Sequence, residues 1–155
     1  MNEISNVAKE GLLRSQIVEE ALSWVGTKFR YGCEEKGKGI DCARFIMAVY
    51  KKVGIVPERF QPTHLPRDWF RFPDKFDKHE FRKDLFKYGI AIPVENREPG
   101  DVISFYYNNM ECHLGIIIDD EFMVHAMPYQ KVKKAKIKSY GQICSIYRAR
   151  VFYAE

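Results

Sequence analysis

One cysteine and two histidines of this chain have the types and the order that thiol chemistry needs. Cys42 follows an aspartate at the start of a helix-like pattern, and His113 and His125 come far downstream. A thiol becomes a strong nucleophile when a base removes its proton, and a third group can hold that base in a productive orientation. The three residues together predict nucleophilic catalysis, with one histidine as the base and the other as its orienting group.

The segment that begins at Cys42 predicts an amphipathic helix. Its apolar residues recur at helical spacing, at Phe45, Ile46, Val49, Tyr50 and Val53. Asp41 is a favoured N-cap residue, and Gly54 stands where helices commonly stop. Cys42 would then lie in the first turn, where unpaired backbone N–H groups and the helix dipole favour a thiolate. The alternative is that Cys42 is a small buried apolar side chain, as most free cysteines are.

The two histidines fall in segments with the pattern of strands. His113 opens an apolar run, His125 lies within the next one, and the polar residues 119–121 between them predict a hairpin turn. Alternation along a strand then puts both histidines on one face of the sheet and Cys112 on the other face. Either histidine alone would be more typical of a core or surface residue, so the interpretation depends on the pair.

Cysteine and histidine usage argues against a disulfide framework and against a metal site. The chain starts without a basic region followed by an apolar run, so we expect no signal peptide and no oxidising compartment. The candidate zinc ligands lack the paired spacing of structural sites; they are Cys33, Cys42, Cys112 and His113. We expect His64 and His79 at the surface, and neither a metal nor a cofactor in the protein.

Composition and charge are those of an ordinary globular protein. With 155 residues, 46% of them apolar, and a mean hydropathy of -0.37, the chain predicts a single domain over residues 1–155. No run approaches the ~20 apolar residues of a membrane span, so we expect no membrane partner and a chain that is cytoplasmic when made. A net charge of +4 suits an anionic polymer such as the cell wall or nucleic acid. The lysine-rich residues 131–138 have no nucleic-acid motif beside them and predict a charged edge strand, so we expect no nucleic-acid partner.

Residues 57–98 form an insertion that is rich in proline and aromatic residues. Four prolines within residues 57–73 exclude a regular element there, and residues 81–88 predict a short helix closed by Gly89. The aromatic side chains must pack on the body of the protein, as a cover or as the wall of a groove. Two interpretations stay open: the insertion enlarges a small core, or it shapes substrate access or docks a partner.

Five short segments occur in a fixed order along most of the chain. They are residues 26–32, 39–42, 99–105, 113–116 and 124–126. Their order and spacing resemble the NlpC/P60 cysteine peptidase family, and most of all its phage-associated branch of cell-wall peptidases and tail-assembly proteins. The insertion and the ending at residues 148–153 also resemble that branch.

The resemblance implies an α+β, papain-like fold, in which a helix bearing the nucleophilic cysteine packs on an antiparallel β-sheet. By motif, Cys42 would be the nucleophile, His113 the base and His125 the orienting group. Members of the family cleave peptidoglycan stem peptides, commonly between a D-γ-glutamyl residue and a diamino acid. We therefore expect a cysteine peptidase or amidase that hydrolyses cell-wall peptide bonds.

Departures from the family pattern concern the residues that would bind substrate. The family commonly follows Asp-Cys with Ser-Gly, and here Ala43 and Arg44 stand in those places. Phe29 replaces a family tyrosine, and Tyr31 on the same side of the segment is a candidate substitute. We expect Asp41, Tyr31 and Arg44 to bind substrate. Arg44 suits a substrate carboxylate because guanidinium groups bind carboxylates bidentately, and the alternative is a solvated helix face.

Two other functions stay open. The chain could be a phage tail or virion assembly module with secondary or no hydrolysis, with tail proteins as partners and a place in the virion or, after release, at the cell wall. The complete set of Cys42, His113 and His125 argues for an enzyme, because a docking module needs none of the three. The same thiol could transfer an acyl group, but no membrane anchor accompanies it, so this reading ranks last.

Overall fold

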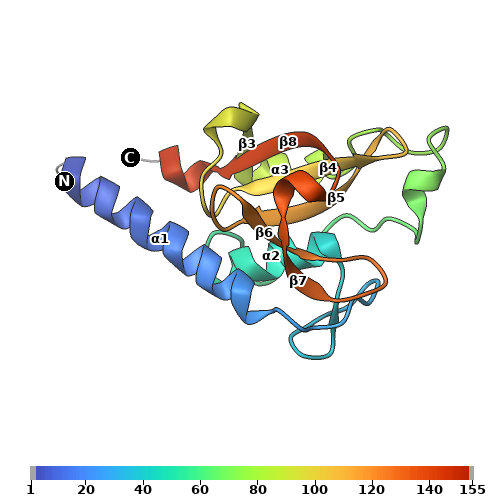
Figure 1. The fold of residues 1–155 in the computed structure, drawn as a ribbon, viewed down its shortest axis with the longest axis horizontal. Helices are drawn as coiled ribbons and strands as arrows, with labels where there is room; N and C mark the ends of the chain where they lie inside the picture. Colours follow the sequence, from blue (N-terminus) through green and yellow to red (C-terminus); the bar gives the residue numbers. More distant parts are fainter. Residues whose placement is uncertain (1–2, 154–155) are drawn as a thin grey trace.

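A six-stranded antiparallel sheet carries both histidines, and the helix that begins at Cys42 packs against it (Figure 1). The computed structural model describes residues 3–153. The strands of the sheet are β3 (Gly89–Ile92), β4 (Val102–Tyr107), β5 (Met110–Ile117), β6 (Phe122–Ala126), β7 (Val132–Lys136) and β8 (Gln142–Ala149). They lie in the order β3-β8-β4-β5-β6-β7, and each neighbouring pair is antiparallel. A separate hairpin joins β1 (Glu34–Glu35) to β2 (Gly39–Ile40).

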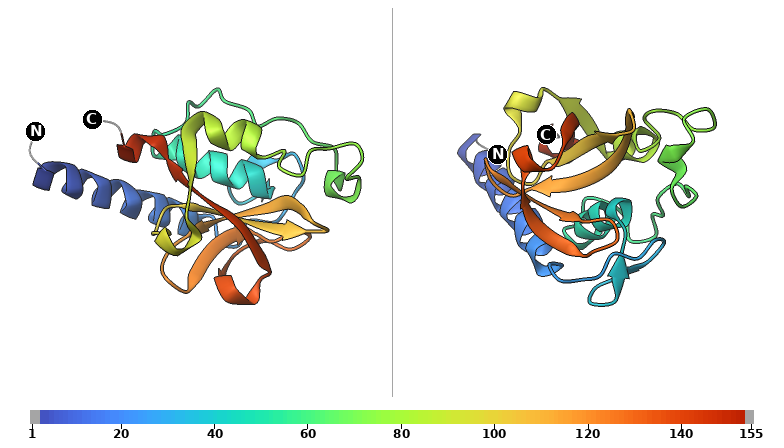
Figure 2. Two further views of the ribbon diagram at one scale, coloured as in Figure 1. Left: turned by 90° about the horizontal axis from the view of Figure 1, so that it is seen from above. Right: turned by 45° about the vertical axis from the view of Figure 1, so that its right-hand side comes forward.

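The helices lie at the start and in the middle of the chain. They are α1 (Glu3–Ser23), α2 (Cys42–Lys52) and α3 (Arg82–Tyr88), with short 3-10 turns at η1 (Trp69–Arg71), η2 (Val94–Asn96), η3 (Ile137–Ser139) and η4 (Arg150–Tyr153). Figure 2 shows the N-terminal half of α1 reaching past the body of the protein, while its other end approaches α2. No helix within residues 3–153 is long and apolar enough to cross a membrane.

Apolar side chains cover both faces of the sheet. On the helix side, Phe45 and Ile46 of α2 belong to one buried cluster with Leu114 of β5 and Val124 of β6. The other face carries a second cluster, made of Ile103, Phe105, Ile117, Met123, Ile137 and Ile146. Successive residues of β5 and β6 thus face opposite ways, which confirms the alternation predicted for the two strands.

A β-bulge interrupts this alternation next to the first histidine. Phe105 of β4 pairs with His113, but the next residue, Tyr106, pairs with Glu111, so Cys112 is the extra residue of β5. Cys112 lines the cleft that His113 also lines. It packs against the helix-side cluster that contains Leu114, whereas Phe105, the partner of His113 on β4, belongs to the cluster on the other face. Cys112 therefore points away from the His113 face, as predicted.

The insertion at residues 57–98 contributes irregular chain, one helix and one strand. The irregular conformation expected over its prolines is confirmed apart from the single turn η1, and α3 matches the short helix predicted before Gly89. Strand β3 was not expected; it pairs with β8 and forms one edge of the sheet. Lysine-rich β7 forms the opposite edge, as predicted.

Candidate active site

Asp41 fixes the start of α2 and places Cys42 in its first turn. Asp41 has extended backbone angles, and its Oδ1 accepts a hydrogen bond of 2.9 Å from the Arg44 backbone N–H. This confirms the predicted N-cap. Cys42 is half-buried and lines a cleft between α2, the insertion and the turn after β6.

The two histidines meet across the β5–β6 hairpin. His113 Nε2 lies 2.7 Å from His125 Nδ1, and both residues are buried. The remaining ring nitrogens, Nδ1 of His113 and Nε2 of His125, are buried without a hydrogen-bond partner among the described residues. His113 lines the same cleft as Cys42, so its free Nδ1 is the ring atom left for the thiol. The predicted pairing of the histidines on one sheet face is thus present.

Gly115 lets the two histidine strands approach this closely. A side chain added at Gly115 would place its Cβ 3.3 Å from the His125 Cβ and 3.0 Å from the Met123 sulfur. Such contacts would push β6 away from β5 at the level of the histidine pair. The residue in this position therefore controls whether the hydrogen bond between the imidazoles can form.

Burial dominates the titration of the thiol and of both imidazoles. Burial and the neighbouring Asp41 and Cys112 raise the Cys42 pKa, and backbone hydrogen bonds from Leu114 and Ala43 offset this only in part. Burial and the neighbouring imidazole lower the pKa of His113. The resting pair is therefore a neutral thiol beside a neutral imidazole. The backbone N–H at the helix start lowers the Cys42 pKa in the expected direction, but burial of the charge raises this pKa by more.

The low basicity of the histidine pair predicts that the fold loses stability as the pH falls. Burial and Lys133 lower the His125 pKa from 6.5 to about 4. Between these values the unfolded chain binds a proton that the folded chain does not, so the stabilisation is complete above pH 6.5 and declines below it. For His125 alone the change is on the order of 3 kcal/mol. Urea unfolding at pH 7.5 and pH 4.5 measures it, and His125→Asn should show a shallower decline. His64→Asn, which alters an exposed histidine, serves as the control, and equal declines in all three proteins would contradict the prediction.

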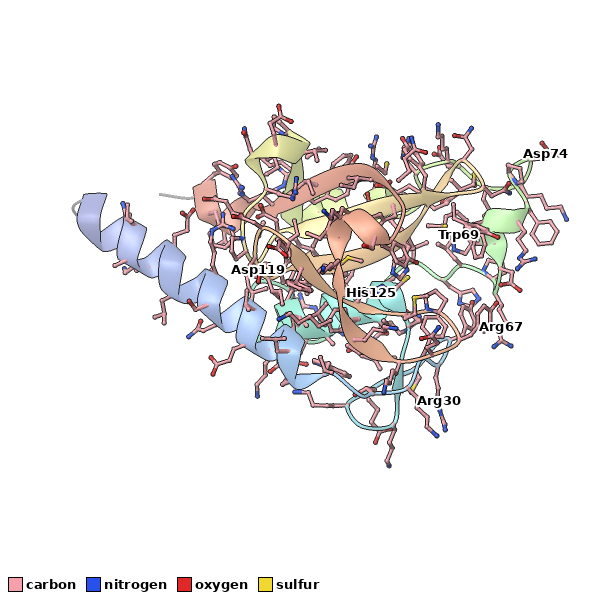
Figure 3. The ribbon with its side chains drawn as sticks, in the orientation of Figure 1. Arg30, Arg67, Trp69, Asp74, Asp119 and His125 are labelled. Carbon is pink, nitrogen blue, oxygen red and sulfur yellow. The ribbon has the colours of Figure 1, made fainter. Side chains whose placement is uncertain are left out.

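The cleft beside the thiol has a volume of about 370 Å³ and is walled on one side by the insertion. Residues from Pro62 to Arg71 form that wall, and Tyr107, Met127 and Tyr129 contribute from the sheet side. Figure 3 shows Trp69 and Arg67 of the wall to one side of His125. Trp69 is also buried against Phe81 at a ring-centroid distance of 5.6 Å. The insertion therefore both extends the core and shapes access to Cys42.

All three residues predicted to bind substrate line this cleft, and each already has a hydrogen-bond partner within the protein. Arg44 Nη1 lies 2.9 Å from Asp41 Oδ2, which also accepts a bond of 2.8 Å from the Gly32 N–H. Both Asp41 oxygens are therefore occupied. The Tyr31 hydroxyl donates to the Leu65 carbonyl of the insertion, so it ties the cleft wall in place rather than standing free beside the nucleophile.

A second polar cluster lies around Glu111, which is fully buried. Its partners are the hydroxyls of Ser104 and Tyr147, the His79 imidazole and the Arg82 guanidinium. The expectation that His79 is a plain surface residue is wrong, because its Nδ1 lies 3.1 Å from the buried Glu111 Oε1. His64 is exposed, as expected.

His79, Glu111 and Cys144 have the atom types of metal ligands and lie within 4.8 Å of one another, the one such group within residues 3–153. The Arg82 Nε lies 3.6 Å from the Glu111 Oε1 and already supplies the positive charge that a cation would bring. Glu111 also accepts from two hydroxyls. The cluster therefore fits an internal ion-pair network better than a metal site.

Sequence reasoning missed two residues of the cleft. Cys112, the extra residue of β5, lines the cleft, and Tyr140 covers the histidine pair from the turn η3 that follows β7. Tyr140 occurs in a short polar segment with no periodicity. Only the closing of the sheet brings it to the histidines, so no local pattern could have identified it.

Solved structures share this arrangement of helix and sheet. The NlpC/p60 domain of the peptidoglycan hydrolase SagA has a TM-score of 0.60 and 19% identity, covering 87% of this chain and 97% of that chain. An NlpC/P60 family protein from Bacillus cereus has a TM-score of 0.65 and 19% identity, covering 87% of this chain and 39% of that chain. These likenesses show the fold, and they confirm the α+β, papain-like class that the sequence segments implied.

Sequence comparison then identifies the family. The model of the NlpC/P60 family matches residues 26–150, so the chain belongs to the NlpC/P60 family, whose members are cysteine peptidase-type hydrolases. The gamma-DL-glutamyl hydrolase of Bacillus subtilis is 28% identical over 126 residues, which are 79% of this chain and 25% of that protein. The murein DD-endopeptidase MepS/murein LD-carboxypeptidase of Escherichia coli is 26% identical over 125 residues, 81% of this chain and 55% of that protein. The chain thus spans about a quarter to about half the length of these bacterial relatives.

Proposed function

We propose that this protein hydrolyses peptide bonds of the bacterial cell wall, with Cys42 as nucleophile, His113 as general base and His125 as its orienting group. The observation that carries the proposal is the 2.7 Å contact between the two imidazoles beside a cysteine at a helix start. The names of its relatives, a murein endopeptidase among them, point to the same substrate. A relation to phage proteins remains a prediction.

The hydrogen bond between the histidines sets the tautomer that the reaction needs. For His113 Nδ1 to accept the thiol proton, the resting proton must lie on Nε2, which then donates to His125 Nδ1. His125 carries its own proton on Nε2. In this state His113 is neutral and basic at the atom that remains free, as general-base catalysis requires.

The reaction follows in two halves. His113 takes the proton from Cys42 as the sulfur attacks the amide carbonyl carbon, and backbone N–H groups in the first turn of α2 meet the charge on the oxygen. The protonated imidazole passes its proton to the amide nitrogen, the C–N bond breaks and the amine leaves. Water, deprotonated by His113, then attacks the thioester, releases the carboxylic acid and restores the thiol.

Digestion of chemically defined peptidoglycans tests the proposal. Wild-type protein should release peptide fragments that mass spectrometry can identify, and Cys42→Ala should release none. Cys144→Ala is the matched control, because that half-buried cysteine lies outside the cleft. Absence of fragments from all wall types would contradict wall hydrolysis. Binding of phage tail proteins that survives Cys42→Ala would then favour the assembly module.

Arg44 tests which substrate group lies at the start of α2. Its Nη1 is held by Asp41, and its other donors remain for a carboxylate in the cleft. Arg44→Gln should raise KM for a stem peptide with a free carboxylate by about tenfold, while kcat stays near the wild-type value, because ground-state binding is lost. The same peptide with that carboxylate amidated is the control. Equal KM values for both proteins on both peptides would leave Arg44 as a solvated helix residue.

A further inference from the structure

Tyr140 covers the histidine pair with its ring. It follows η3, and its backbone N–H donates to the Ile137 carbonyl at 3.2 Å. The ring stacks on His113, with centroids 4.8 Å apart and planes inclined by 30°. It also meets His125 edge-on at 4.9 Å, and Phe105 packs edge-on against it at 4.8 Å. One aromatic side chain therefore contacts both imidazoles at once.

Among the described residues, the two imidazole rings have no hydrogen bond other than the one that joins them. One hydrogen bond joins the two rings, and the outer nitrogen of each has no partner among the described residues. An imidazole held by a single hydrogen bond can still turn about its Cβ–Cγ bond. The stacked ring blocks that rotation for His113, and Phe105 lies on the same side of the strand with its centroid 6.3 Å from His113.

We infer that Tyr140 is a positioning residue, whose ring holds the His113 imidazole so that Nδ1 faces Cys42 and keeps water from the histidine pair. The inference rests on the proposed role of His113 as the base. The exclusion of water follows from the stacking contact, since an aromatic ring packed against an imidazole takes the place of the water that would otherwise bind there.

The ring rather than the hydroxyl carries this role. Tyr140 is partly buried and lines the cleft near Cys42 and Cys112. Burial and the two neighbouring thiols raise its pKa, so the phenol stays protonated near neutral pH and does not compete with His113 as a base. The stacking contacts involve ring atoms that phenylalanine also has.

The test is the alkylation rate of Cys42 by iodoacetamide as a function of pH, measured peptide by peptide because Cys112 shares the cleft. His113→Ala defines the rate without the base. In Tyr140→Leu, the part of the Cys42 alkylation rate that depends on His113 should fall at least about tenfold at pH 7. The apparent pKa of the acid limb of its pH profile should rise toward 6.5, because the imidazoles become hydrated. Tyr140→Phe should keep more than about a third of the wild-type rate and the wild-type profile.

Turnover measurements separate positioning from substrate binding. Tyr140→Leu should lower kcat and leave KM near the wild-type value. Tyr140→Met, which fills similar space without a flat ring, should have the same effect and replaces Tyr140→Leu if that variant folds poorly. Tyr153→Leu is the control, because Tyr153 is an exposed tyrosine outside the cleft.

Each outcome of these measurements decides the matter. A Tyr140→Leu protein with wild-type alkylation and kcat would overturn the inference alone. A Tyr140→Phe protein as slow as Tyr140→Leu would overturn it too, because the hydroxyl would then be the essential group. Equal alkylation rates in wild-type and His113→Ala protein would overturn the base itself, and the role of Tyr140 with it.

Discussion

Cys42→Ala should abolish the release of product from cell-wall peptides, with an expected fall of about 10⁵-fold or more in kcat. Without the thiol no acyl intermediate forms, and the histidine pair has no nucleophile to activate. Folding should change little, because Cys42 lies at the rim of the core with one side in the cleft. Kinetics on a purified stem peptide, with thermal unfolding measured in parallel, give both quantities.

Controls for the Cys42 experiment come from the other three cysteines. Cys33→Ala and Cys144→Ala alter thiols outside the cleft, so both proteins should keep the wild-type kcat. Cys112→Ala removes the second thiol of the cleft. Burial raises the Cys112 pKa to about 11, so this thiol is uncharged near pH 7 and its loss should leave the alkylation rate of Cys42 near the wild-type value. Hydrolysis that persists in Cys42→Ala but ends in Cys112→Ala would mean that the nucleophile is the bulge cysteine.

The second large effect comes from the histidines, and it differs between them. His113→Ala removes the proton acceptor and should lower kcat by about 10⁴-fold. His125→Ala leaves His113 in place but removes the group that orients its imidazole, so the loss in kcat should be about 10²-fold to 10³-fold. His125→Asn should be milder still, because its amide oxygen can accept the proton that His113 Nε2 donates.

The order of these three losses is the quantity to measure. Stopped assays at pH 7.5 on one peptide give kcat for all three proteins, with His64→Ala as a control at an exposed histidine. If His125→Ala proved more damaging than His113→Ala, the roles of base and orienting group would be reversed.

The helix and the hairpin could be predicted because each follows one local repeat. The spacing of Phe45, Ile46 and Val49 fixes the buried face of α2, and Asp41 marks its start. Alternation brought His113 and His125 to one sheet face, and the structure brings them within hydrogen-bond distance. Both results need only the periods of the helix and the strand.

The features that were missed depend on contacts between distant segments. The bulge at Cys112 belongs to the pairing of β4 with β5, and Tyr140 contacts His113 from a segment that lies far from it in the sequence. The neutral state of Cys42 is set by burial, which a helix-start argument cannot measure. Strand β3 belongs to an insertion whose short apolar run becomes a strand only because β8 lies beside it.

The Glu111 carboxylate links the insertion to strand β5 and should make the two unfold together. Glu111 lies in β5, two residues before His113, and its partners His79 and Arg82 come from the insertion. Local opening of the insertion would leave this buried charge without compensation, which carries a free-energy penalty of several kcal/mol. Opening of residues near His79 is therefore tied to loss of the sheet itself, so these amides should exchange with solvent only when the whole domain unfolds. The stretch from Pro62 to Arg71 has no such contact with Glu111; the bonds that hold it join Thr63 to Asp84 and Leu65 to Tyr31, outside the Glu111 cluster.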